Sequence, residues 1–320
     1  MKSQVKNAFV ICSVLALGQC IWRWDRIVSN YKQEPITLEM TTEPPIDDVI
    51  DIDVDRILED YPNVRPNYWN KSFHNDHEFL NHIVPWHTSA KHKVLLYPTV
   101  SFSSNTFRVL LAIKSTTPDY QLRCLVRRTW LSKEAWDYKV AINGTERQVE
   151  VQHVFLFGLY NEDDYEKLKS ENDKFHDILL GEFVDSFQTL AIKEHLFLNF
   201  LNDIGTDSID YIYKGDTDVL VNPPMLIEQM LLTAEKQREF ICGCRSVGVL
   251  PFRDMMSKYF VPEELWPANK TYEPYVSGGG FILTAGLARQ MIEVKDSVTI
   301  FPIDDAYLGS IVNLATDRFK

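Results

Sequence analysis

Short apolar segments that alternate with stretches of helical spacing constrain the fold of this chain more than any other feature. The strand-like segments are 107–113, 151–158, 177–183 and 210–215. Helical spacing follows in 117–130, 161–172 and 187–201. Apolar runs of this length, bounded by polar residues, predict strands that are buried on both faces. Strands alternating with helices predict an α/β domain with a mostly parallel central sheet flanked by helices.

The N-terminal region contains a nearly uninterrupted apolar run at residues 7–22, which Trp24 and Ile27 extend towards the length of a membrane-spanning helix. No small-residue cleavage site follows the run, and tryptophan suits a membrane interface. We therefore predict a cytoplasmic tail at 1–6 and a signal-anchor transmembrane helix at 7–27. A cleaved signal peptide and a buried soluble helix are the alternatives.

Residues 28–94 are predicted to be a stem and the segment that leads into the domain. Residues 33–66 are acidic, contain five prolines and lack periodic apolar positions, as in a poorly ordered linker. Histidines then recur at positions 74, 77, 82, 87 and 92. Their spacing matches no common metal cage, so we interpret them as part of the leading segment rather than as a metal site. The domain extends over 95–320.

Charge and sequons limit the class of partner. The formal net charge is −12, which argues against a nucleic-acid partner because phosphate backbones need clustered cations. Glycosylation sequons begin at Asn70, Asn143 and Asn269 and favour a lumenal location.

The cysteines of the domain are Cys124, Cys242 and Cys244. Cys242 and Cys244 are too close in sequence for an easy mutual bridge, and the absence of a C-x-x-C pair excludes a zinc ribbon. One disulfide from Cys124 to either partner and three free thiols both remain open.

Two carboxylates follow the last predicted strand, 210–215. Asp216 and Asp218 stand one residue apart. Ligands of open α/β sheets bind at the carboxyl ends of strands, where two carboxylates can hold a hard divalent cation that neutralises a diphosphate. The alternative is a role in capping the turn. Similar spacing at 51–55 lacks a preceding strand, and we interpret it as solvated charge.

Ordered blocks over about residues 95–316 resemble the motifs of β-1,3-galactosyltransferases and β-1,3-N-acetylglucosaminyltransferases. The blocks are similar, in order, to R-x-T-W (127–130), F-L-L-G (155–158), D-I-L through N-L-x-L-K (177–194), K-x-D-x-D-V-F-V-N (213–222), Y-P-P-Y-x-x-G-G-G-Y (272–281) and P-I-D-D-V-Y-x-G (302–309). The Lys-Glu pair at 193–194, Val276 and the Pro-Ile-Asp-Asp form resemble the N-acetylglucosaminyltransferase branch more closely.

This resemblance implies an inverting transferase with a GT-A type fold and a Mn²⁺ cofactor. The expected reaction moves a hexose or N-acetylhexosamine, galactose or N-acetylglucosamine, from a UDP-sugar donor to the 3-hydroxyl of a glycan acceptor on a glycoprotein or glycolipid. The resemblance also implies a single-pass type II protein of the Golgi membrane, with a lumenal catalytic domain.

The resemblance assigns catalysis to the second aspartate of the Pro-Ile-Asp-Asp block. Asp305 is the expected base for the acceptor hydroxyl, and Asp304 is expected to orient it or to contact the donor sugar. The alternative is that both carboxylates cap the helix that follows.

The resemblance of the other blocks also implies which residues bind the donor and the metal. Asp218 is the expected direct metal ligand, with Asp216 nearer the ribose or a metal-bound water. The expected donor-binding residues are Arg127, Asp185, Lys193, Lys214, Asp216, Gly278, Gly279, Gly280 and Asp304. The alternative role for Arg127 is a structural salt bridge. The alternative role for the three glycines is a tight turn before a strand at 281–284.

The chain stops sooner after Gly309 than members of this family usually do. This leaves a second hypothesis, a catalytically inactive lumenal protein that binds or scaffolds. A secreted glycosidase is disfavoured, because it needs two carboxylates flanking a cleft and would not explain the strand-linked Asp-x-Asp.

Overall fold

The computed structural model describes residues 93–142, 144–159, 163–234, 239–254 and 257–318. The predicted tail, anchor and stem, and the sequons at Asn70 and Asn143, lie outside these residues. Within the described part of the chain, no helix has both the length and the apolar character needed to cross a bilayer.

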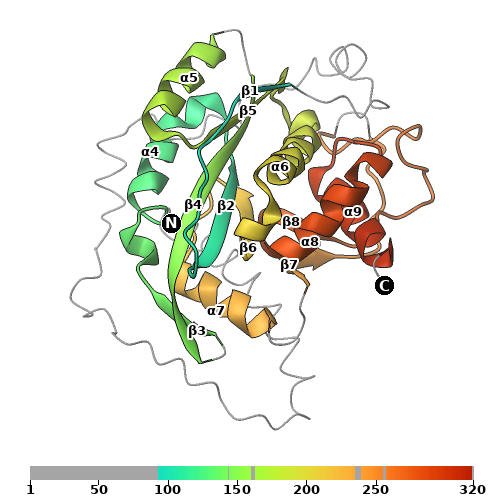
Figure 1. Cartoon of the computed structure of the whole chain (residues 1–320). Helices are drawn as coiled ribbons and strands as arrows, with labels where there is room; N and C mark the ends of the chain where they lie inside the picture. Colours follow the sequence, from blue (N-terminus) through green and yellow to red (C-terminus); the bar gives the residue numbers. More distant parts are fainter. Residues whose placement is uncertain (1–92, 143, 160–162, 235–238, 255–256, 319–320) are drawn as a thin grey trace, which may run out of the picture.

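One mixed sheet forms the centre of the domain (Figure 1). Its strands run in the order β1-β5-β4-β2-β6-β8-β7, and β3 pairs with β4 outside this path. The strands are β1 (Val94–Leu96), β2 (Phe107–Lys114), β3 (Lys139–Ile142), β4 (Thr145–Leu159), β5 (Ile178–Val184), β6 (Tyr211–Asp216), β7 (Ile241–Ser246) and β8 (Tyr275–Thr284).

Helices cover both faces of the sheet, with α4, α5 and α7 on one side and α6, α8 and α9 on the other (Figure 1). They are α4 (Tyr120–Arg128), α5 (Asp164–Phe175), α6 (Leu190–Ile204), α7 (Pro223–Ala234), α8 (Ala285–Val294) and α9 (Asp304–Arg318). Short 3₁₀ turns are η3 (Thr117–Asp119), η4 (Glu134–Trp136), η5 (Phe187–Thr189), η6 (Thr206–Ser208) and η7 (Lys295–Ser297).

The apolar run of β2 explains this layering. Its side chains alternate between the two faces, so Leu110 and Ala112 enter the core under α6 while Leu111 and Ile113 enter the core under α4. A strand placed between β4 and β6, with helices on both faces, has its side chains buried from Val109 to Lys114.

The predicted parallel strands are confirmed as β2, β4, β5 and β6, whose mutual pairings are all parallel. The flanks of the sheet differ, because β1, β7 and β8 pair antiparallel. The glycines at 278–280 lie within β8 rather than in a turn before it, which corrects the alternative considered above. Cys124, Cys242 and Cys244 form no disulfide with one another in the described structure.

Candidate active site

The carboxyl ends of the neighbouring strands β2 and β6 create the centre of the site. Lys114 and Asp216 are the last residues of these strands and are register partners. Thr217 then turns the chain, because its N–H and its hydroxyl both donate to the Lys114 carbonyl, at 3.1 and 2.7 Å. This anchor leaves Asp216 and Asp218 on either side of a buried threonine.

A buried ammonium joins this edge to the start of α9. Lys114 Nζ lies 2.7 Å from Asp304 Oδ2 and 3.3 Å from Asp216 Oδ1. Burial alone would lower the pKa of Lys114, but the surrounding carboxylates, Asp304 foremost, raise it well above its ordinary value. The ammonium is therefore a fixed positive charge between the two acidic segments.

Asp305 lies beside this ammonium, against a glycine of β8. A Cβ added to Gly278 would stand 2.5 Å from Asp305 Oδ1 and 3.0 Å from Lys114 Nζ, so only glycine fits there. The Gly278 backbone N–H is hydrogen-bonded to Asp305. Loss of hydration and the neighbouring Asp304 raise the pKa of Asp305 to about 7, against the opposing effects of Lys114 and this N–H. A carboxylate with that pKa is suited to accept a proton near neutral pH.

Asp218 is exposed beyond the turn. Loss of hydration raises the pKa of Asp218, and the nearby negative charges of Asp216 and Asp119 also raise it. Such crowding of carboxylates favours a cation, and Asp216 is also partly open to solvent, with a side chain 39% exposed.

Asp216 and Asp218 fit a divalent ion that is bound partly by protein carboxylates and partly by substrate. No group of three or more His, Cys, Asp and Glu side chains among the described residues is arranged to hold a metal alone. Mg²⁺-like ions often bind through one or two carboxylates together with substrate phosphates and water. Asp216 and Asp218 provide that minimal donor set.

The remaining glycines of β8 differ from Gly278. Gly280 and Gly215 make room for the Tyr213 hydroxyl, which would lie 3.0 and 2.5 Å from added Cβ atoms. A Cβ on Gly279 would meet nothing within 4 Å. Gly279 therefore borders open space, where a ligand can approach the backbone.

Arg127 lies in a network of salt bridges inside the fold. Its guanidinium donates to Asp177 at 2.7 and 2.9 Å and to Glu171 at 2.7 Å. The same group lies over the rings of Phe155 and Phe175. This is the salt bridge left open as the alternative, and we exclude Arg127 from the candidate donor site.

Asp185 and Lys193 are also internal. Lys193 Nζ is 2.8 Å from Asp185 Oδ2 and donates to the Ser115 carbonyl at 2.8 Å. Both side chains are buried, so they fix the loop that follows Lys114 and do not face the solvent from which a donor would bind. The donor contact proposed for them stays a prediction that these internal contacts do not support.

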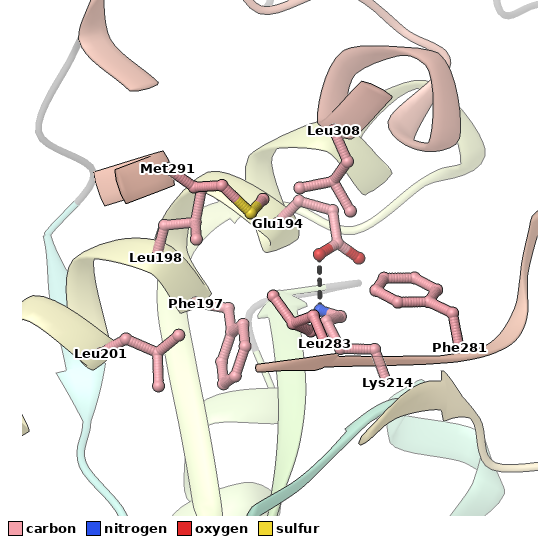
Figure 2. A pocket seen from close by; sticks show the side chains of 9 residues that line it. All are labelled: Glu194, Phe197, Leu198, Leu201, Lys214, Phe281, Leu283, Met291 and Leu308. Carbon is pink, nitrogen blue, oxygen red and sulfur yellow. Dashed lines mark ion pairs between the residues drawn. The ribbon is translucent and has the colours of Figure 1, made fainter. Parts of the chain in front are cut away.

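Lys214 of β6 is buried on the face of the sheet that α6 covers. Figure 2 shows its ammonium facing Glu194 inside a cavity walled by apolar side chains, with the charged atoms 2.5 Å apart. Burial lowers the pKa of Lys214, and Glu194 opposes that effect. The structure places Lys214 inside the core, and its donor contact stays a prediction.

Lys114 was missed by the sequence reasoning. The available signal was a lysine directly after the apolar residues 109–113, at the end of the predicted strand. Asp304, Asp305, Asp216 and Gly278, which the sequence reasoning did select, all surround or adjoin this ammonium.

The chain matches the Galactosyltransferase family over residues 121–316, which is more than half of its length. It belongs to that family. The resemblance to β-1,3-glycosyltransferases is thereby confirmed, and the match spans the structural network of Arg127, the Asp-Thr-Asp turn, β8 and the start of α9.

Similar curated proteins of this galactosyltransferase family carry N-acetylglucosaminyltransferase names. The chain is 34% identical over 206 residues to the rat UDP-GlcNAc:betaGal beta-1,3-N-acetylglucosaminyltransferase 7, covering 63% of this chain and 49% of the relative. It is 34% identical over 207 residues to the human N-acetyllactosaminide beta-1,3-N-acetylglucosaminyltransferase 2, with the same coverage. The human acetylgalactosaminyl-O-glycosyl-glycoprotein beta-1,3-N-acetylglucosaminyltransferase is 31% identical over 214 residues, covering 65% of this chain and 52% of the relative. The chain spans about half the length of these relatives.

Proposed function

We propose that this galactosyltransferase-family chain is an inverting β-1,3-glycosyltransferase of GT-A type, which uses a UDP-sugar and a divalent ion such as Mn²⁺. The observation that carries the proposal is the Lys114 ammonium, which contacts Asp216 on the predicted nucleotide side and Asp304 next to the predicted base. The two halves of the expected reaction therefore share one edge of the sheet.

Asp305 is the proton acceptor in this proposal. The acceptor 3-hydroxyl oxygen attacks C1 of the donor sugar from the face opposite the UDP, and its proton moves to an Asp305 carboxylate oxygen. The bond between C1 and the diphosphate oxygen breaks, and UDP leaves with the electron pair. One displacement inverts the configuration at C1.

Asp216 and Asp218 hold the divalent ion in this proposal, which when bound supplies the positive charge that neutralises the diphosphate. Lys114 holds Asp304 and Asp216 at fixed positions, so that the base and the nucleotide-binding carboxylates keep their relative geometry. Gly279 leaves space for close approach of the donor sugar to the β8 backbone.

N-acetylglucosamine is the donor sugar that we propose to test first. The names of the similar proteins support it, as does the Pro-Ile-Asp-Asp form of the block that contains Asp305. A glycan that ends in galactose is the matching acceptor class, with a glycoprotein or glycolipid as its carrier.

We also propose the lumenal, Golgi-anchored location expected from residues 7–27. Asn269 supports it, because this sequon asparagine is exposed in a turn where an oligosaccharide can be attached. A smaller endoglycosidase-sensitive mass shift in Asn269→Gln than in the original protein, with unchanged membrane attachment, would be the supporting result. A cytosolic chain without N-glycans would contradict the location.

The activity is tested with purified full-length protein, a panel of UDP-sugars and galactose-terminated acceptors, with and without Mn²⁺. The proposal predicts metal-dependent transfer, fastest from UDP-N-acetylglucosamine, with an inverted 1,3 linkage in the product. Absence of transfer from every UDP-sugar would refute it, whereas fastest transfer from UDP-galactose would correct only the donor.

A further inference from the structure

A cluster of aromatic side chains lies on the surface of the loop between β7 and β8. Phe252 and Tyr259 are 54% and 41% exposed, and Phe187 of η5 is partly exposed beside them. The ring centroids of Phe187 and Tyr259 lie 5.2 Å apart, and those of Phe252 and Tyr259 lie 5.7 Å apart. We call these three residues the aromatic platform. Clustered apolar exposure of this kind marks a binding surface.

The aromatic platform is held by an ordered framework. The Val261 N–H donates to the Phe252 carbonyl at 3.0 Å, and the Arg253 guanidinium donates to the carbonyls of Val261 and Trp266. Trp266 in turn packs against Phe301, with ring centroids 5.2 Å apart. The exposed rings are therefore presented by a loop that is fastened to the core.

Both attachment points of the aromatic platform lie at the edge of the sheet that carries the candidate site. Phe187 follows the carboxyl end of β5, two residues after the buried Asp185. The loop that carries Phe252 and Tyr259 starts at the end of β7, where Ser246 bonds to the Tyr275 side chain. Tyr275 is close enough to Asp305 for that carboxylate to raise its pKa, although burial is the larger cause.

We propose that the aromatic platform stacks against an internal sugar of the acceptor glycan. This inference rests on the proposed function. The C–H groups on one face of a pyranose are apolar and slightly positive, and they complement the negative face of an aromatic ring. Lys258 Nζ lies 4.9 Å from the ring centroids of both Phe187 and Tyr259, so an ammonium donor for sugar hydroxyls borders the rings.

An internal sugar is the occupant that the positions favour. Asp216 and Asp218 occupy the end of β6, on the far side of the parallel strands β4 and β2 from β5 and Phe187. The donor therefore has its own place on this edge. The reacting sugar must touch Asp305, whereas the rings belong to η5 and to the loop after β7, which follow other strands at the same edge, so they suit a sugar further along the acceptor.

The test compares binding of a galactose-terminated disaccharide and hexasaccharide to the full-length protein by calorimetry, with UDP and Mn²⁺ present, beside transfer kinetics. The variants are Phe252→Leu and Tyr259→Leu, which keep an apolar side chain but remove the ring. Tyr259→Phe and Phe252→Tyr are the matched controls that keep it. Thermal unfolding verifies that each variant is folded.

The leucine variants are expected to weaken hexasaccharide binding about tenfold, as for the loss of one aromatic contact, and to leave disaccharide binding unchanged. The aromatic controls are expected to match the original protein. Equal effects on both acceptors, or no effect on either, would overturn the proposal. A change in sedimentation with unchanged glycan affinity would instead assign the surface to a second copy of the chain and also overturn it.

The binding measurement separates this proposal from the proposed function. A chain that binds the hexasaccharide through these rings but transfers no sugar would refute the transferase and preserve the platform. A chain that transfers sugar with the same acceptor-length dependence in every variant would refute the aromatic platform and preserve the transferase.

Discussion

Lys114 and Asp216 are register partners at the ends of two adjacent parallel strands, and the Lys114 ammonium lies 3.3 Å from the Asp216 carboxylate. The same ammonium reaches Asp304 at 2.7 Å, although the two residues are 190 positions apart in the sequence. One buried cation therefore connects the strand that ends in the Asp-Thr-Asp turn with the helix that starts beside Asp305.

Replacing Lys114 with methionine is expected to destabilise the domain and to slow transfer. The change leaves two acidic side chains without their cation, and breaking a buried ion pair costs about 3–5 kcal/mol in free energy of unfolding. Denaturant unfolding measures this loss. Lys139→Met is the control, because its pair with Glu146 spans 3.7 Å between exposed side chains and should change stability by less than about 1 kcal/mol. Equal effects of the two changes would contradict the bridging role.

Gly278→Ala is expected to reduce the turnover number because the new Cβ would stand 2.5 Å from Asp305 Oδ1 and displace it. Misplacing a reacting group by about 1 Å can cost about 100-fold in rate. Gly279→Ala is the control for stability, since its Cβ meets no protein atom within 4 Å. Steady-state kinetics of Gly278→Ala against the original protein, and thermal unfolding of both variants, measure the effects. Unaltered turnover in Gly278→Ala would show that the close contact is not required.

The pH profile follows from the pKa of Asp305, which is raised to about 7 by burial and by Asp304. The base must be deprotonated, so kcat/KM is expected to rise with pH through about 7 and then level off. Kinetics at saturating Mn²⁺ over this range measure the profile. A profile that is flat between pH 5 and about 8 would contradict Asp305 as the base.

The same raised pKa has an opposite consequence for stability. The folded protein binds the Asp305 proton more tightly than the unfolded chain does, so the stabilisation present below the ordinary value of 3.8 is lost as pH rises to about 7. The free energy of unfolding of the original protein should therefore fall, relative to Asp305→Asn, across that window. Parallel curves for the two proteins would contradict the shift.

Asp218→Ala is expected to weaken Mn²⁺-dependent UDP binding by at least about tenfold, because an octahedral ion loses one of its few protein ligands. Calorimetry with UDP at fixed Mn²⁺ measures the affinity, and Asp207→Ala serves as a control at an exposed aspartate of η6. Unchanged affinity in Asp218→Ala would remove this residue as a ligand.

The sequence predicted the centre of the fold because burial on both faces leaves a strong pattern. β2 is apolar from Val109 to Ile113 and is enclosed by β4 and β6. The antiparallel flanks were not predicted, because β1 is only three residues long and the glycines of β8 are typical of a turn. Within the strand, Asp305 and Tyr213 leave no ordinary room for a side chain at Gly278 and Gly280.

The sequence located the carboxylates but not their partners. Arg127, Lys193 and Lys214 each have carboxylates as partners inside the fold, and no local pattern reveals such long-range pairs. The block resemblance selected these positions but could not separate contact with a ligand from support of the fold. Lys114 was missed for the same reason, since its role depends on Asp304, which is 190 positions away in the sequence.

The measurement that tests the central claim most directly is Asp305→Asn assayed for transfer and for Mn²⁺-dependent UDP affinity in the same preparation. The account predicts a loss of transfer of about 10²–10⁴-fold, because general-base catalysis is removed, with UDP affinity unchanged within about twofold. Transfer at the original rate, or loss of UDP binding in parallel with transfer, would contradict the assignment of Asp305 as the base of a separate acceptor side.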